Sequence, residues 1–298
     1  MRFHDALSGQ LPIRIGLWIG QHMPRSVGYG LSRAVASFVV RFKPVVYWTV
    51  RRNLCQVMGH DVDDEMIHQV FYHAGQTYYD FFRAVGQPPS EIVRSVGISS
   101  ATLDLVRSEM AADRGVLLLG IHMSNFDLAL LMLGAQGLSA QLLSLASPRA
   151  GFDLLDDMRK VESLEVTMIS PQSLRAAIRR LKGGGLVMTG ADRPVPGEPT
   201  LTEFFGRPAC LPVGPARMAL ITGATVLLGA CVHDPEQGYV LDISGPIEMV
   251  RTGNREEDVL ASTRRLAIVM ENYVRAHPAQ WMMFHPVWPD LPDGEEAG

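Results

Sequence analysis

The chain has 298 residues, 47% of them hydrophobic and 19% charged, and it carries a net charge of −4. This length can bury a sizeable core, and the composition excludes a collagen-like or low-complexity chain. The charge is uneven, because residues 1 to 60 hold eight Arg and Lys residues against one Asp and are basic in an otherwise acidic chain. Since these basic residues alternate with aliphatic and aromatic ones, the segment favours contact with an anionic membrane surface over nucleic acid.

Apolar residues recur at steps of three and four through residues 11 to 85, which predicts a helical first third. The apolar stretches near the start are too short, or too interrupted by Arg14 and Arg33, to span a bilayer, which needs about 20 largely uncharged residues. A signal-peptide cleavage site is also lacking. We therefore expect residues 1–85 to be a helical membrane-associating region of a peripheral protein on the cytoplasmic face of the cell membrane. Ordinary core-packing helices explain each of these segments equally well.

After a Gly/Pro break at residues 86 to 89, short apolar runs alternate with longer periodic segments. The strands are expected at residues 116–121, 141–146, 164–169, 186–190, 225–232 and 239–244. Helices are expected to start near Phe126, Gly151, Pro171 and Val213, with a last helix from about Arg255 to Ala276. Most of the strand segments lack polar alternation, as strands covered on both faces do. The sequence thus predicts an α/β fold with a mixed, mostly parallel central sheet wrapped by helices, and residues 86–298 form the α/β core of one compact unit.

The most distinctive segment is RGVLLLGIHMSNFDLALLMLG, where a buried-type strand ends and the chain passes His122 before it enters an apolar helix. Ligands bind beyond the carboxyl ends of strands in open α/β sheets, and a helix start offers N–H groups to an oxyanion or phosphate. Asp127 is within reach of the His122 imidazole if the backbone bends back. The same residues fit a capping box, with Ser124 as the cap and Asp127 three residues on. Spacing alone leaves both interpretations open.

Three further blocks accompany this turn: RRNLCQVMG at 51–59, ADRPVPGEPTLTEFFGRPACLPVGPARMALITGA at 191–224 and HPAQWMMFHPVWP at 277–289. With the His-x-x-x-x-Asp of His122 and Asp127, they resemble the glycerolipid and lysophospholipid acyltransferase superfamily from about residue 10 to 289. The likeness is greatest to the branch of lipid A lauroyl/myristoyl acyltransferases and phosphatidylinositol mannoside acyltransferases. ADRPVPGEP stands where glycerol-phosphate acyltransferases have Glu-Gly-Thr-Arg, which favours a glycolipid or another lipid hydroxyl as the acceptor.

The resemblance implies transfer of a fatty acyl chain from an acyl thioester, acyl-CoA or acyl-ACP (acyl carrier protein), to a hydroxyl of a membrane lipid or glycolipid. His122 is then the general base, since an imidazole titrates near neutral pH and can take the hydroxyl proton. Asp127 would hold one ring nitrogen and stabilise the imidazolium. No Ser or Cys lies in a nucleophile-elbow setting, so the attack is expected to be direct, without a covalent acyl-enzyme.

The matching blocks supply the other candidate residues. Glu203 is expected to reach His122 as a third catalytic residue, with Glu198 as the alternative. The candidate substrate-binding residues are Asn125, Arg149, Arg159, Asp192, Arg193, Glu198 and Arg217. A guanidinium suits a phosphate, and an acid beside an Arg at a strand end suits a sugar or headgroup, but each of these charges also fits a solvated surface.

Two other function classes remain open at this point. The first is a metal-dependent hydrolase that uses His122 and Asp127 with His277 or His285, although the sequence has no cluster with metal-ligand spacing and its three cysteines are far apart. The second is a non-catalytic lipid-binding protein on the same fold. We expect no metal and no cofactor apart from the acyl thioester co-substrate, and the sequence does not determine the donor, the acceptor or the acyl-chain length.

Overall fold

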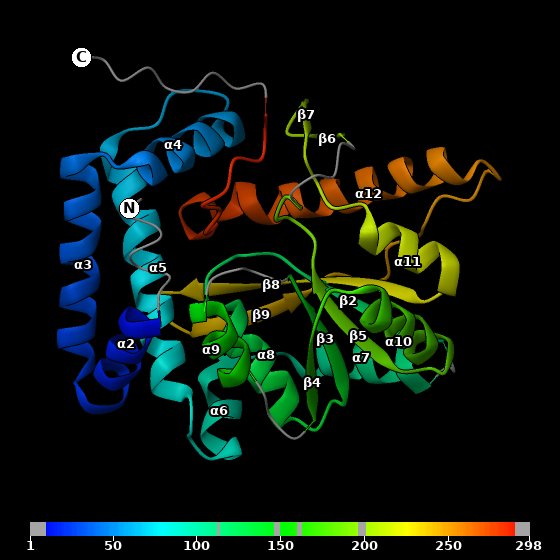
Figure 1. The fold of residues 1–298 in the computed structure, drawn as a ribbon, viewed down its shortest axis with the longest axis horizontal. Helices are drawn as coiled ribbons and strands as arrows, with labels where there is room; N and C mark the ends of the chain where they lie inside the picture. The colour runs from blue at the N-terminus through cyan, green and yellow to red at the C-terminus, as the bar shows by residue number, and fades with distance from the viewer. Residues whose placement is uncertain (1–9, 112–113, 146–149, 160–162, 196–200, 290–298) are drawn as a thin grey trace.

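The computed structural model describes residues 10–111, 114–145, 150–159, 163–195 and 201–289. The described part of the chain begins with α2 (Gln10–His22), α3 (Arg25–Phe42), α4 (Val45–Met58) and α5 (Asp64–Ala84), which lie together at one end of the molecule (Figure 1). Local sequence sets their limits: Asp63 caps α5 by accepting a hydrogen bond from the backbone N–H of Met66, and Gly59 ends α4 in the left-handed conformation. The expected helical first third is confirmed.

The central sheet has seven strands, β1 (Val96–Gly97), β2 (Val116–Gly120), β3 (Ala140–Ser144), β4 (Leu164–Met168), β5 (Leu186–Gly190), β8 (Thr225–Asp234) and β9 (Gly238–Ile243). Their order is β1-β9-β8-β2-β5-β3-β4, and all neighbours are parallel except β8 and β9. The six expected strands are confirmed to within two residues at each end. The sequence pattern did not predict β1 or the hairpin of β6 (Thr202–Phe204) and β7 (Arg207–Ala209), because two or three residues are too few to display a period.

Helices surround this sheet, with α12 crossing one side of it and α8 on the other (Figure 1). They are α6 (Pro89–Ser95), α7 (Ser100–Ala111), α8 (Phe126–Ala135), α9 (Ala150–Met158), α10 (Pro171–Lys182), α11 (Gly214–Thr222) and α12 (Arg255–Ala276), followed by the short 3₁₀-helix η1 (Pro278–Gln280). The expected helix starts are confirmed to within one residue. The expected limits of α12 are confirmed. The helix starts at Arg255 because Asn254 caps it and an acidic first turn follows the cap.

Two apolar clusters make up the core on either side of the sheet. Successive residues of β2 point to opposite faces, so that Leu117 and Leu119 join one cluster while Leu118 joins the other. The N-terminal helices contribute to both, with Val57 of α4 in the first and Phe81 of α5 in the second. These helices therefore pack as neighbours of the sheet, and the division of the chain at residue 85 stays a prediction.

The C-terminal segment returns to the end of β2. The backbone N–H of Ser124 donates to the carbonyl of Gln280 (2.8 Å), and the N–H of Met282 donates to the carbonyl of His122 (2.8 Å). Met123 and Trp281 pair between them as an antiparallel bridge. Residues almost 160 positions apart thus form one short stretch of paired backbone at the carboxyl end of the central strand.

Candidate active site

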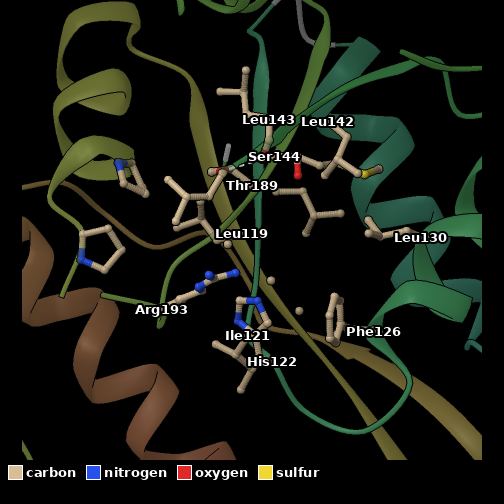
Figure 2. Close-up of a pocket in the computed structure, with 18 of the residues that line it drawn as sticks. Leu119, Ile121, His122, Phe126, Leu130, Leu142, Leu143, Ser144, Thr189 and Arg193 are labelled. Carbon is tan, nitrogen blue, oxygen red and sulfur yellow. Dashed lines mark hydrogen bonds between the residues drawn. The ribbon is translucent and has the colours of Figure 1, made fainter. Parts of the chain in front are cut away.

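A cavity of about 420 Å³ lies at the carboxyl ends of β2, β5 and β3. Figure 2 shows His122 and Arg193 beside each other in one part of it and leucines from β2, β3 and α8 in another. The apolar part of the lining includes Leu119, Phe126, Leu130, Leu142 and Leu143. A mostly apolar cavity with a few convergent polar groups is the usual form of a small-molecule site.

Three glycines form part of the same lining. Gly120 ends β2, and it pairs in register with Gly190 on β5 and Gly229 on β8. A Cβ atom added to Gly190 would lie 3.5 Å from Cε1 of His122. The absence of a side chain at Gly190 therefore leaves room directly beside the imidazole.

His122 lies two residues beyond the end of β2, and its side chain is 27% exposed. Its Nδ1 is 2.7 Å from Oδ1 of Asp192, and its backbone N–H donates to Oδ2 of the same carboxylate (2.9 Å). Since a carboxylate only accepts hydrogen bonds, Asp192 favours the tautomer with the proton on Nδ1. The lone pair of Nε2 is then available to accept a proton from a ligand in the cavity.

Asp192 is completely buried two residues beyond the end of β5. Burial would raise the pKa of this carboxyl, but His122 and the indole N–H of Trp281, which donates to Oδ2 (2.9 Å), lower the pKa below its usual value overall. The group is therefore ionised at neutral pH and can stabilise a positive charge on the imidazole. Its lack of exposure corrects our expectation that Asp192 contacts substrate.

Asp127 does not hold the ring of His122 as expected. It lies in the first turn of α8, and its Oδ1 accepts a hydrogen bond from Nε of Arg159 (2.7 Å), while Nη1 of Arg159 contacts Asp156 (2.5 Å). Burial would lower the pKa of Arg159, but the two carboxylates raise it above its usual value. Because helix α8 directs the Asp127 carboxylate toward α9, this buried cluster of three charges joins the two helices. Arg159 also lines the cavity, as expected for a substrate-binding candidate.

Asn125 and the expected capping box are also corrected. The N-cap of α8 is Asn125 and not Ser124: its Oδ1 accepts from the N–H of Leu128 (3.2 Å), and its Nδ2 donates to the carbonyl of Thr77 (3.2 Å). Asn125 is completely buried, so its side chain holds the helix start and not a substrate. Ser124 has a φ of +43°, a conformation that leads the chain away from His122 into the helix.

The remaining candidates are spread over the molecule. Arg193 lines the cavity beside His122 (Figure 2), whereas Arg217 lies on the exposed face of α11 and is not part of the lining. Glu203 was expected to reach His122, but its side chain is 58% exposed on β6 and pairs with Arg264 (2.8 Å). Arg149 and Glu198 lie outside the described residues.

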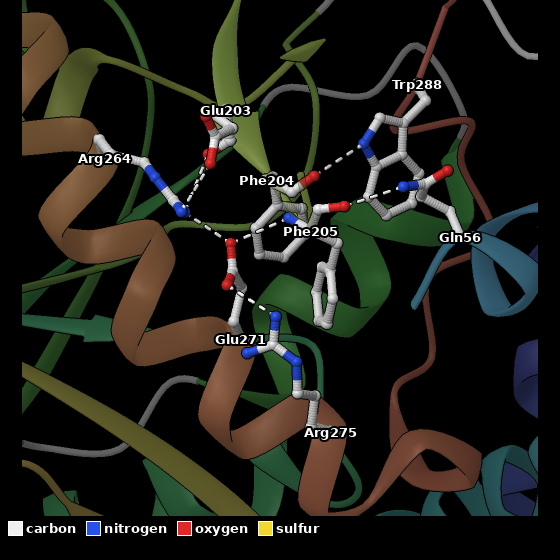
Figure 3. Close-up of polar contacts among 8 residues, drawn as sticks. All are labelled: Gln56, Glu203, Phe204, Phe205, Arg264, Glu271, Arg275 and Trp288. Carbon is white, nitrogen blue, oxygen red and sulfur yellow. Dashed lines mark hydrogen bonds and ion pairs between the residues drawn. The ribbon is translucent and has the colours of Figure 1, made fainter. Parts of the chain in front are cut away.

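Glu203 instead borders a cluster centred on Glu271 of α12 (Figure 3). The buried Glu271 carboxylate accepts from the N–H of Phe205 (2.9 Å), from Arg264 (2.6 Å) and from Arg275 (2.9 Å). Phe205 has a φ of +50° in the turn between β6 and β7, which is costly for a residue with a side chain. Glu271 therefore stabilises a strained turn. Burial would raise the pKa of Glu271, but its three donors lower the pKa overall.

Replacing Glu271 by Ala is expected to lower the free energy of unfolding by about 2 to 3 kcal/mol, because the Phe205 N–H loses its acceptor. Glu203→Ala removes an exposed partner of the same Arg264 and is expected to cost under about 1 kcal/mol. Urea denaturation of both variants measures the difference, and equal values would contradict it. The pKa of Glu271 is lower in the folded than in the unfolded protein. The carboxylate therefore contributes fully to the free energy of unfolding above the unfolded-state pKa, and this contribution is lost as the pH falls through the folded-state pKa.

Sequence reasoning missed the pairing of His122 with Asp192 and the hydrogen bond from Trp281 to Asp192. A signal for the pair was present, since β2 continues as Gly-x-His and β5 as Gly-x-Asp. Gly120 and Gly190 are in register, so that His122 and Asp192 stand at the same offset beyond neighbouring strands.

Among the side chains that the structure describes, no group of three or more His, Cys, Asp or Glu could hold a metal ion. No helix in the described ranges is long and apolar enough to cross a membrane.

The sequence is similar to a known protein family and to named relatives. Residues 12–289 match the family described as bacterial lipid A biosynthesis acyltransferase. The phosphatidylinositol mannoside acyltransferase of Mycobacterium tuberculosis (strain ATCC 25618 / H37Rv) is 26% identical over 256 residues, which cover 83% of this chain and 79% of the relative. That of Mycolicibacterium smegmatis (strain ATCC 700084 / mc(2)155) is 24% identical over 98% of both chains. The resemblance is confirmed: the chain belongs to the bacterial lipid A biosynthesis acyltransferase family and is an O-acyltransferase that acts on lipids.

Proposed function

We propose that the protein transfers a fatty acyl chain from an acyl thioester, acyl-CoA or acyl carrier protein, to a hydroxyl of a membrane glycolipid. The names of the relatives favour a mannosylated phosphatidylinositol as the acceptor. The observation that supports the proposal is the His122–Asp192 pair beside the apolar cavity. A base at one part of a cavity lined with leucines suits a substrate with a reactive carbonyl and a hydrocarbon tail.

In this mechanism Nε2 of His122 takes the proton of the acceptor hydroxyl as its oxygen attacks the thioester carbonyl carbon. Asp192 holds the proton on Nδ1 and stabilises the imidazolium, without taking the proton itself. The tetrahedral intermediate then collapses, the C–S bond breaks, and the imidazolium returns its proton to the departing thiolate. The products are the acylated lipid and the free thiol of the donor.

Arg193 is proposed to stabilise the oxyanion of this intermediate. The backbone N–H groups just after His122 are engaged elsewhere, since Met123 donates to the carbonyl of Ile121 (2.7 Å) and Ser124 to that of Gln280 (2.8 Å). Arg193 lines the cavity with its guanidinium toward His122 (Figure 2). A positive charge there would favour the negative oxygen of the transition state over the neutral thioester.

The test is a transfer assay with the purified chain, acyl-CoA or acyl carrier protein donors of increasing chain length, and vesicles that carry phosphatidylinositol mannoside or a lipid A precursor. We expect mass spectrometry to detect an acylated acceptor, with turnover that EDTA does not reduce. Release of free fatty acid in place of the acylated acceptor, abolished by EDTA, would favour the metal-dependent hydrolase. Lipid binding without product in any combination would favour the non-catalytic lipid-binding protein.

We also propose that the N-terminal helices bind the cytoplasmic face of the membrane. Their exposed apolar side chains, here called the N-terminal stripe, are Leu11, Ile15, Trp18, Val27, Leu31, Val35, Phe38, Phe42 and Val45. On α3 they follow helical spacing along one face, and the basic residues Arg25, Arg33, Arg41 and Lys43 are exposed in the same region. An apolar face bordered by cations suits the interface of an anionic bilayer.

The double variant Leu31→Glu, Phe38→Glu is expected to weaken binding to anionic vesicles by about tenfold or more, because two apolar anchors become charged. The matched control is Leu260→Glu, Ile268→Glu on α12, where the same change falls on side chains 40% and 46% exposed. Sedimentation with vesicles of phosphatidylglycerol and phosphatidylcholine measures both. Equal retention of the two variants would contradict the role of the N-terminal stripe.

A further inference from the structure

Trp281 contacts Asp192 of the proposed catalytic pair without being part of the cavity lining. Its side chain is 1% exposed, and its indole N–H donates to Oδ2 of Asp192 (2.9 Å). Oδ1 of the same carboxylate is the atom that faces Nδ1 of His122. The two oxygens therefore have different tasks: one meets the imidazole, and the other is held by the indole and by the backbone N–H of His122.

This arrangement restricts the carboxylate of Asp192. The terminal torsion of an aspartate is broad, so that one hydrogen bond leaves the plane of the carboxylate free to turn. Two donors on Oδ2 fix that plane and keep a lone pair of Oδ1 directed at the ring. The orientation of the base would therefore depend on a side chain that is not itself part of the cavity lining.

The indole is itself held firmly in place. Phe204 packs against it edge to face at 6.1 Å between ring centroids, and Trp288 does so at 6.4 Å. Phe204 in turn stacks on Trp288 at 5.6 Å, and Nε1 of Trp288 donates to the carbonyl of Phe204 (3.1 Å). Pairing of Trp281 with Met123 fixes the backbone as well. Such an enclosed ring has one position, which makes it a suitable support for Asp192.

We propose that Trp281 is a positioning residue of the transfer reaction, whose indole N–H locks Asp192 in the orientation that holds Nδ1 of His122. The inference rests on the proposed function of His122 and Asp192. A buried indole in any core needs an acceptor for its N–H, so the test must separate the hydrogen bond from the packing of the ring.

The experiment compares Trp281→Phe with Trp288→Phe. Both variants remove one indole N–H from the same aromatic cluster and shrink the same kind of ring, but only Trp281 touches Asp192. We expect Trp281→Phe to lower kcat by about 10- to 100-fold with KM within about twofold, because a hydrogen bond to a charged group is lost. Trp288→Phe should retain kcat within about twofold. Equal losses of kcat in the two variants would overturn the proposal and leave a packing role.

A second substitution protects the test against misfolding. Benzothienylalanine at position 281 keeps the fused two-ring shape and replaces the N–H by sulfur, so it is expected to fold and to reproduce the kcat loss of Trp281→Phe. Adding Trp281→Phe to Asp192→Asn should produce little further loss, because both changes break one unit. Full activity of the benzothienylalanine protein would overturn the proposal.

A readout without turnover distinguishes this inference from the proposed function. In wild type, ¹⁵N NMR of the neutral His122 ring should show the Nδ1–H tautomer, and the benzothienylalanine protein should show a mixture of tautomers. If the wild type transfers no acyl chain to any acceptor, the proposed function fails. If the ring spectrum of the benzothienylalanine protein is unchanged, the role of Trp281 fails, whatever the activity.

Discussion

His122→Ala is expected to lower kcat/KM for acyl transfer by about 10³-fold or more. A lipid hydroxyl is a poor nucleophile, and the variant removes the imidazole proposed to take the proton that must depart as the C–O bond forms. The rest of the site should keep its structure, because the backbone N–H of residue 122 can still donate to the buried Asp192. Steady-state assays at saturating donor, with product measured by mass spectrometry, give the ratio to wild type.

The control for this variant is His60→Ala, which removes an exposed imidazole from the loop after α4. It should retain turnover within about twofold. Both proteins should also bind vesicles like wild type, since neither position belongs to the N-terminal stripe. Turnover of His122→Ala near the wild-type value, in a protein shown to be folded, would remove His122 from the mechanism.

Asp192→Asn is expected to lower kcat by about 10²- to 10⁴-fold with little change in shape. The amide can present an N–H to the ring, which favours the tautomer with its proton on Nε2, where the attacking hydroxyl must be deprotonated. The bonds from the His122 backbone and from Trp281 to the second oxygen can survive. Rates measured at several pH values distinguish two causes of the loss. A wrong tautomer lowers the rate at every pH, whereas a changed protonation equilibrium shifts the pH–rate profile along the pH axis.

Asp127→Asn makes the same chemical change on the carboxylate that the sequence motif had suggested. Because Asp127 is buried and pairs with Arg159, the loss of its charge should appear mainly as a lower free energy of unfolding, by about 3 kcal/mol. The folded fraction should retain more activity than Asp192→Asn. A larger kcat loss in Asp127→Asn than in Asp192→Asn, both folded, would restore the pairing expected from the sequence.

The fold could be predicted from the sequence because its signals are local. Most of the six expected strands lack polar alternation, since helices cover both faces of the sheet. The cap and the acidic first turn of α12 are consecutive in the sequence. The helical first third follows from one periodicity. The hairpin of β6 and β7 is held by residues of α4 and α12 and by Trp288, so its conformation depends on contacts that no local pattern contains.

The site was harder to predict because it depends on where side chains point. His122 and Asp127 are near in sequence, yet the left-handed Ser124 and the cap formed by Asn125 turn the carboxylate toward Arg159. The register of β2 and β5 brings in Asp192, 70 positions from His122. Glu203 fails as a partner because its hairpin packs on α12, where Arg264 meets it.

The backbone pairing of residues 280–282 with the turn after β2 also has a consequence during protein synthesis. A ribosome makes the sheet, its glycine row and both members of the proposed pair well before it reaches Trp281. Until that point the nascent chain lacks the indole and the backbone hydrogen-bond partners of His122 and Ser124. Under the proposed mechanism, the order of translation therefore delays a competent site until residues 280–282 have been made.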